Sequence, residues 1–276
     1  MKQYKALLRK EWQTHRITFL IPSYVVTAFF VFSGLISVYG AIRYGMPDFI
    51  SIGETSRIDP DLVIRGLLYS MSVVLGWFCI LSSMQSNENM LNGDYVKKCE
   101  IMHNSQPVSV LKMMAAKLTL SIPLMMIQYA LLAVISGVII AGVLSIIGVY
   151  SFGTCIGAVL SPLVMIFLSM MSITAIFWLF SCMFRKQAFL KLWISLAVID
   201  VFRLLVMSVW QEIQLFSPFG YFFRIFFLPF SMVKSDIVTF KVAWQTIGMH
   251  ENLISLLVSV LMFIAGYFIY KRRELS

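Results

Sequence analysis

Residues 110–143 read VLKMMAAKLTLSIPLMMIQYALLAVISGVIIAGV and decide the fold class of the chain. From Leu118 onward this stretch holds no charged residue, and it exceeds the roughly 20 apolar residues with which a helix crosses a bilayer. The whole chain of 276 residues has the same character, with 59% hydrophobic and 13% charged residues. A soluble domain carries about 25% charged residues. We therefore predict an all-α membrane protein.

Similar apolar segments recur along the chain and predict six transmembrane helices in a single domain, residues 1–276. The predicted spans are residues 18–40, 62–84, 110–143, 155–184, 190–210 and 253–270. Pro162 should bend the fourth span near its outer end. Six spans leave no room for a separate soluble domain of about 100 residues.

Basic residues are concentrated in four segments and predict the orientation of the chain. Of the 22 Lys and Arg residues, 15 lie in residues 2–16, 97–117, 185–191 and 271–273. Short loops rich in Lys and Arg mark the cytoplasmic side of a membrane. We therefore predict a multi-pass protein of a bacterial-type plasma membrane with both termini in the cytoplasm. The net charge of +9 then reports orientation, and we expect no nucleic-acid partner.

Residues 1–17 predict an amphipathic helix that lies flat on the membrane surface, an elbow helix, with membrane lipids as its partner. Its apolar stripe is formed by Tyr4, Leu7, Leu8 and Trp12, and its Lys and Arg residues fall largely on the other sides. The alternative is an ordinary basic segment next to the first span. No small-residue cleavage site follows, so we expect this segment to be retained.

The sequence carries no motif for nucleotide binding or catalysis. There is no G-x-x-x-x-G-K-[ST], H-E-x-x-H or G-x-S-x-G, and the four cysteines form no C-x-x-C pair. We expect no enzyme activity, no cofactor and no metal in this chain. The missing catalytic groups argue against a membrane enzyme or a sensor without transport.

One acidic residue lies inside a predicted span. Asp200 shares a helix face with Arg203 at a spacing of three residues. This intramembrane pair has two interpretations, a gating or translocation-path pair and a self-neutralising structural pair. A single pair provides no proton relay, which argues against an ion-coupled secondary transporter.

The longest polar segment, residues 85–109, joins the second and third spans on the predicted cytoplasmic side. Asp94 can cap a helix over residues 95–103, on which Tyr95, Cys99 and Met102 share one side, and Pro107 ends it. A short amphipathic helix held between two spans can transmit the movement of a soluble partner. A merely ordered loop is the alternative.

This loop resembles the one between spans two and three in permease subunits of type 2 ATP-binding-cassette (ABC) exporters. The family usually has an acidic residue, Gly-Thr, a short helix, Pro-Val-Ser and a lysine that opens the third span. The matching residues here are Glu88, Gly93, the run Gln106-Pro107-Val108-Ser109 and Lys117, with Asp94 where threonine is usual. The resemblance extends to the N-terminal helix, the six spans and the basic C-terminus, residues 271–274.

The resemblance implies a half-transporter. Two permease chains, as a homodimer or a paired paralogue, would surround a pathway, and two copies of a separate ABC ATPase, which hold ATP and Mg, would dock from the cytoplasm. Residues 95–103 would be the coupling helix. The residues implied in ATPase coupling are Glu88, Gly93, Asp94, Tyr95, Cys99, Glu100, Met102, Pro107 and Lys117.

Residues 211–250 are predicted to form short re-entrant helices on the extracellular side. Their aromatic stretch FSPFGYFFRIFFLPF, residues 216–230, is too short to cross the bilayer. Similar exporters cap their pathway with such helices, and the candidate cap residues are Pro218, Phe222, Arg224 and Pro229. An aromatic anchor at the membrane interface is the alternative.

The substrate class is indicated by composition. The 18 methionines fit a greasy, adaptable lining for an amphipathic or hydrophobic peptide, drug or lipid-like molecule, although simple helix packing also explains them. In size and layout the chain is similar to small Gram-positive exporters of antimicrobial peptides, including those for phenol-soluble modulins.

Overall fold

The computed structural model describes residues 2–44, 60–96, 109–146, 152–209, 215–228 and 250–275. These residues form helices joined by short turns, and they include no strand. The helices are α1 (Lys2–Tyr44), α3 (Pro60–Val96), α5 (Val110–Thr119), the π-helical segment η1 (Leu120–Leu124), α6 (Met125–Ile146), α7 (Phe152–Leu160), α8 (Leu163–Met183), α9 (Ala188–Val209), α10 (Pro218–Phe226) and α13 (His250–Leu275). The predicted all-α class is confirmed.

Four helical stretches in the described part of the chain are long and apolar enough to cross a membrane. They are Leu68–Gly93, Val110–Gly142, Cys155–Met183 and Asn252–Arg272. These stretches correspond to the second, third, fourth and sixth predicted spans and indicate a membrane protein. The first and fifth predicted spans are helical, within α1 and α9, but are not among the four.

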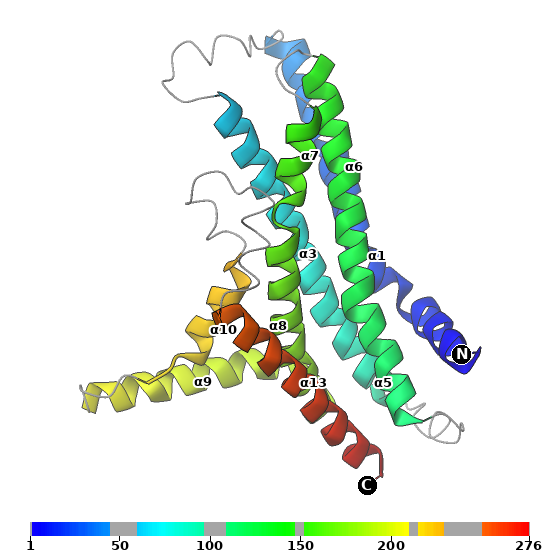
Figure 1. Cartoon of the computed structure of the whole chain (residues 1–276), viewed down its shortest axis with the longest axis vertical. Coiled ribbons are helices and arrows are strands. Elements are labelled where there is room, and N and C mark those ends of the chain that lie inside the picture. Colours follow the sequence, from blue (N-terminus) through cyan, green and yellow to red (C-terminus); the bar gives the residue numbers. More distant parts are fainter. Residues whose placement is uncertain are drawn as a thin grey trace.

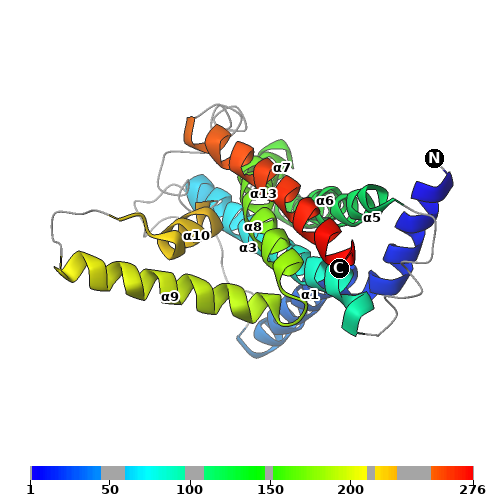
Figure 2. The same ribbon diagram turned by 90° about the horizontal axis from the view of Figure 1, so that it is seen from below.

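Most of the long helices run side by side, and α9 is the exception. Helices α1, α3, α5–α6 and α7–α8 follow the long axis of the molecule, and α13 slants along α8 (Figure 1). Helix α9 lies across that axis and projects from the bundle in both views (Figures 1 and 2). The fifth predicted span therefore does not run alongside the others in this structure.

Two helices extend beyond their predicted ends. Helix α3 continues from the second span to Val96, so Asp94 and Tyr95 lie in its last turn, and Asp94 is not the N-cap of a helix that begins at Tyr95. Helix α1 runs without interruption from Lys2 to Tyr44, where we predicted an elbow helix and a separate span. Its N-terminal part turns away from the long axis of the bundle (Figure 1). The polar residues near residue 90 stay helical because neighbouring helices supply partners for them.

Two prolines interrupt the regular α-helix. Pro162 precedes the first residue of α8, and α7 ends at Leu160, so the expected bend in the fourth span is a break between two helices. Pro123 lies inside η1, which the sequence analysis did not predict. A proline lacks the N–H of the regular ladder and collides with the preceding turn, and a widened π turn relieves this conflict.

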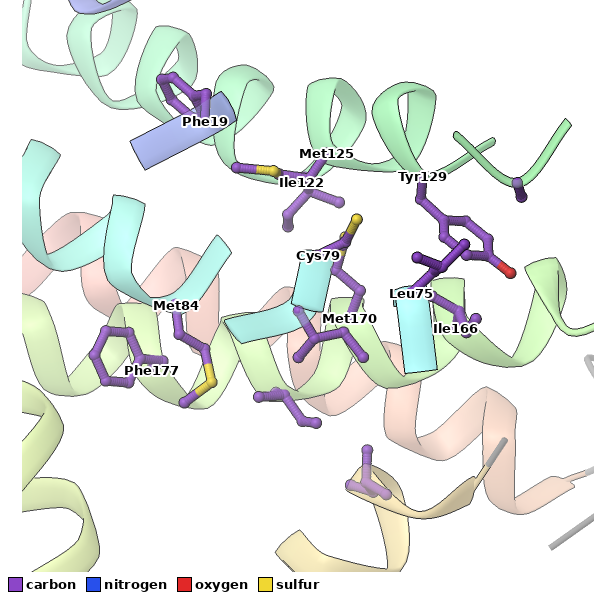
Figure 3. Close-up of a cluster of buried hydrophobic side chains, with 14 of the residues drawn as sticks. Phe19, Leu75, Cys79, Met84, Ile122, Met125, Tyr129, Ile166, Met170 and Phe177 are labelled. Carbon is purple, nitrogen blue, oxygen red and sulfur yellow. The ribbon is translucent and has the colours of Figure 1, made fainter. Parts of the chain in front are cut away.

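A buried apolar core lies between α1, α3, α6 and α8. Figure 3 shows part of it, including Phe19, Met84, Met125, Met170 and Phe177, none of which is more than 1% exposed. These methionines pack between helices of the same chain. Such packing is the interpretation of the methionine content that does not require a substrate pathway. Helix α8 is central. In the span formed by α7 and α8, 67% of the residues are buried, whereas in the span of α13 only 17% are buried.

Candidate functional site

The structure places the coupling residues that it describes, Glu88, Gly93, Asp94, Tyr95 and Lys117, at one end of the bundle. Both termini, the end of α3, the start of α5 and the turn between α8 and α9 lie at the lower end in Figure 1. The described residues of the four basic segments belong to these parts of the chain. We call this end the basic end.

Lys117 is the centre of a charged contact at the basic end. Its side chain, on α5, has no exposed surface. The ammonium group donates a hydrogen bond to the Met90 carbonyl of α3 and lies 3.9 Å from Glu11 Oε1 of α1. A buried ammonium group requires a charged partner and hydrogen-bond acceptors to offset its lost hydration. Lys117 therefore links three helices.

Glu11 extends this contact along α1. Its carboxylate is 5% exposed, and Oε2 lies 3.7 Å from Nε2 of His15, one helical turn further on. The imidazole of His15 also lies over the end of α3, where a Cβ added to Gly93 would be 3.6 Å from its Cε1. That distance is ordinary van der Waals contact, so Gly93 is not required by close packing there.

The N-terminal part of α1 is docked on α5 by its polar and aromatic residues. The Tyr4 hydroxyl lies 2.9 Å from Thr119 Oγ1. Leu7 and Leu8 are both half-buried, and Leu8 packs against the core. Trp12 stacks on the buried Phe19 with ring centroids 5.5 Å apart, and 36% of its surface is exposed. The predicted apolar stripe of the N-terminal helix therefore lies partly against the bundle and partly on the outer surface.

Glu88 and Asn92, one turn apart on α3, hold the reverse turn between α8 and α9. The Glu88 carboxylate accepts hydrogen bonds from the N–H groups of Ala188, at 3.0 Å, and Phe189, at 3.3 Å. These are the first two residues of α9, whose N–H groups have no partner within the helix and favour a negative charge. The Asn92 amide donates to the carbonyls of residues 181 and 184 at the end of α8.

Together these contacts form what we call the basic-end junction: Glu11, His15, Glu88, Asn92 and Lys117. The resemblance to exporters identified Glu88 and Lys117, and the sequence analysis missed the other three. The spacing of four residues between Glu11 and His15, and between Glu88 and Asn92, places each pair on one helix face and was the available signal.

Several predicted coupling residues are not among the residues that the structure describes. Cys99, Glu100, Met102 and Pro107 lie outside the described residues, as does the predicted helix over residues 95–103. The backbone of Asp94 and Tyr95 is described within α3, but their side chains are not. Pro229 of the predicted cap is also outside the described part.

The Asp200–Arg203 pair is formed and also anchors the next helix. Arg203 Nε lies 2.7 Å from Asp200 Oδ1. The Ser217 hydroxyl lies 2.9 Å and 3.0 Å from the two oxygens of this carboxylate and also accepts a hydrogen bond from the N–H of Gly220. Ser217 is the N-cap of α10, so the carboxylate of α9 fixes the start of α10. These contacts fit the structural interpretation of the pair, and both of its interpretations stay predictions.

Helix α10 packs against the side of the bundle. Pro218 is its first residue. Phe222 is 2% exposed and its ring contacts that of Trp193 on α9, whereas Arg224 is exposed. The Trp77 indole of α3 donates to the Phe226 carbonyl at 2.9 Å. Because Trp77 lies near the middle of α3, the predicted cap residues of α10 do not lie over an end of the bundle.

Within the described ranges, no three His, Cys, Asp or Glu side chains are grouped so that they could hold a metal ion. No family model, curated protein or solved structure matches the chain.

Proposed function

We propose that the chain is the permease subunit of an ATP-driven ABC exporter, which pairs with a second permease chain and with two copies of a separate ATPase. The observation that carries this proposal is the basic-end junction. It surrounds the two helix ends, Val96 and Val110, between which the predicted coupling segment lies. ATP and Mg would be held by the ATPase, not by this chain.

The junction has the mechanical connections that coupling requires. A force on residues 97–108 acts first on the end of α3 and the start of α5. Lys117 joins these two helices to α1, and Glu88 and Asn92 join α3 to α8 and α9. Breaking a buried ion pair leaves an uncompensated charge, so the helices shift together more easily than they separate. If the complex has two arrangements of its helices, binding of ATP would shift it toward the arrangement that binds ATP more tightly.

The distribution of charge supports docking of the ATPase at the basic end. The positive-inside rule makes this end cytoplasmic, the side on which ATP is available. The six-span arrangement, with α1 and α9 as the remaining spans, is part of the proposal. Three side chains of α9, Val198, Phe202 and Leu205, are 61%, 66% and 61% exposed. An apolar face of this kind is suited to lipid or to the second permease chain.

Co-purification tests the proposal. The tagged chain would be extracted from its native membrane in a mild detergent, and co-eluting proteins identified by mass spectrometry together with an assay of ATP hydrolysis. We expect an ATPase subunit to co-elute. Replacement of residues 97–108 by a Gly/Ser linker of equal length should abolish that association and leave membrane insertion intact.

The matched control replaces residues 147–151, which connect α6 to α7 in the sequence, with a linker of the same kind. The end of α6 lies at the opposite end of the bundle (Figure 1). This control variant should retain the ATPase. Absence of any ATPase from the wild-type preparation, or its retention by the 97–108 variant, would contradict the proposal. Charge reversal at Glu88 is unsuitable as a coupling test, because this residue also caps α9.

The proposed substrate is an amphipathic or hydrophobic molecule, of which an antimicrobial or phenol-soluble-modulin-like peptide is the first candidate. Inside-out vesicles containing the complex should accumulate a labelled amphipathic helical peptide when ATP is supplied. A soluble oligosaccharide is the control substrate. Equal accumulation of both would contradict the substrate class.

An ion-coupled carrier is the second candidate, and one observation favours it. Glu11, His15 and Lys117 form a group of ionisable side chains that is almost wholly removed from solvent, a feature common along proton paths. The discriminating measurement is uptake by proteoliposomes of the purified chain under a pH gradient without ATP. Gradient-driven uptake would favour the carrier, and its absence the exporter.

A further inference from the structure

Three buried polar side chains on α3 and α8 have no hydrogen-bond partner in the described structure. They are Asn87, through both its amide nitrogen and oxygen, Trp178 through its indole Nε1, and Ser181 through its hydroxyl. Their exposed fractions are 0%, 2% and 0%. A polar atom left without a partner in an apolar interior costs free energy, and most buried polar groups are therefore satisfied.

The three side chains lie on facing turns of two neighbouring helices. Helices α3 and α8 run in the same direction, and the hydroxyls of Ser83 and Thr174 lie 3.2 Å apart between them. A step of four residues keeps the same helix face. That step leads from Ser83 to Asn87 on α3 and from Thr174 to Trp178 on α8. Ser181 follows three residues after Trp178, again on that face.

All four candidate membrane spans meet around these residues. One buried apolar cluster contains Leu91 of α3, Met114 of α5, Trp178 and Cys182 of α8, and Tyr270 of α13. Gly266 of α13 covers the indole closely, since a Cβ added there would lie 2.7 Å from Cδ1 and 2.9 Å from Nε1 of Trp178. The surroundings are therefore apolar and closely packed, and they favour a very small ligand.

We propose that Asn87, Trp178 and Ser181 bind ordered water between α3 and α8. The amide, indole and hydroxyl groups offer donors, the amide and hydroxyl oxygens offer acceptors, and none of the three carries a charge. A neutral molecule that both donates and accepts matches this set. A buried water makes about three hydrogen bonds to groups that otherwise have no partner. This inference is independent of the proposed export function.

Hydroxyl-radical footprinting by X-ray radiolysis tests the proposal, because bound water generates radicals beside the residues that hold it. The full-length protein would be irradiated in lipid nanodiscs and its oxidation mapped by mass spectrometry. We expect Trp178 to be oxidised despite its burial. Phe177 and Tyr129, both 0% exposed, are the internal controls and should remain unlabelled.

Two variants test the assigned ligands. Asn87→Leu should abolish the oxidation of Trp178 and lower the unfolding temperature, because a bridging water is lost. Ser181→Ala should reduce the oxidation and provides a second test if the leucine variant does not fold. The matched control is Ser86→Ala, since the Ser86 hydroxyl is buried but donates to the Ser82 carbonyl of its own helix. It should leave the oxidation of Trp178 unchanged.

Three results would overturn the proposal. The first is an unlabelled Trp178 in the wild-type protein. The second is unchanged oxidation in both the Asn87 and the Ser181 variants. The third is an increase in unfolding temperature for Asn87→Leu, which would show that the amide is an unmet polar group without water, since removing such a group is stabilising.

Discussion

Lys117 combines complete burial with partners from two other helices. Its position in the sequence was predicted from the loop that resembles those of exporters, but its surroundings were not. Glu11 was not singled out from the sequence, because a contact between residues 11 and 117 leaves no trace in local periodicity. Asp200 and Arg203 show the opposite case, since both partners lie on one helix and their spacing of three residues predicted the pair.

Removal of the Lys117 charge should destabilise the protein strongly. Lys117→Met leaves the Glu11 carboxylate buried without its cation, and we expect a loss of about 3–5 kcal/mol in unfolding free energy. The double variant with Glu11→Gln should recover part of this loss, because no uncompensated charge remains. Thermal unfolding in detergent measures both. Lys112→Met is the control, since Lys112 is exposed and bonds only to Gln3 in the described structure. Equal losses for both lysines would contradict the role of Lys117.

Gly266 should be intolerant of even one additional carbon atom. Gly266→Ala places Cβ 2.7 Å from the Trp178 ring, which must shift, and we expect a cost of about 1–3 kcal/mol. Gly157→Ala on α7 is the matched control, because nothing lies within 4 Å of its added Cβ. It should change stability by less than about 1 kcal/mol. A fully stable Gly266→Ala protein would show that α13 packs less closely on α8.

The C-terminal half of α3 makes polar contacts with three other helices, α5, α8 and α9. We expected a span that ends at residue 84 and a loop after it, because the residues that follow are polar. The helix instead continues, since Glu88 and Asn92 find partners on α8 and α9 and the Met90 carbonyl receives the Lys117 ammonium group. Polar residues in a local segment predict exposure to solvent. Their hydrogen-bond partners come from distant parts of the chain and cannot be recognised from the local sequence pattern.

Loss of the Glu88 carboxylate should loosen the start of α9. Glu88→Ala removes the acceptor for two N–H groups, which corresponds to about 0.5–2 kcal/mol for a helix cap. Hydrogen–deuterium exchange at residues 188–191 should become faster while exchange in α6 stays unchanged. Gln85→Ala, at an exposed position of the same helix, is the control. Unchanged exchange at the start of α9 would mean that the turn after α8 is held by other contacts.

At the scale of the molecule, hydropathy predicted the helical class and six spans, and four of these correspond to described helical stretches that are long and apolar enough to cross a membrane. Apolar length is a local property, so it was readable from the sequence. The direction of α9 was not, because it depends on contacts with distant parts of the chain, with Glu88 near its start and with Ser217 through Asp200 near its middle. A bend at Pro162 was predicted from a single residue and is found as a break between two helices, whereas the π turn at Pro123 was not predicted.

The arrangement predicts that both termini are accessible from the same side of the membrane. Protease-cleavable tags at the N- and C-termini should be removed together in inside-out vesicles and protected together in right-side-out vesicles. Tyr44 and Pro60, the ends of α1 and α3, lie at the opposite end of the bundle (Figure 1). A tag inserted in the sequence between them should behave in the reverse way. Cleavage of one terminal tag without the other would require an odd number of spans.

The π turn at Leu120–Leu124 has a consequence for how the chain tolerates changes in length. Such a turn corresponds to one residue more than a regular helix would use over the same distance. A sequence that lacks Pro123 would therefore continue as an α-helix and still direct Met125 and Tyr129 into the core. Deletion of Pro123 should preserve folding, measured by size-exclusion chromatography, whereas deletion of Ile173 in the middle of α8 should rotate every later side chain and abolish it. The third span thus contains a site where single-residue insertion or deletion is structurally permitted.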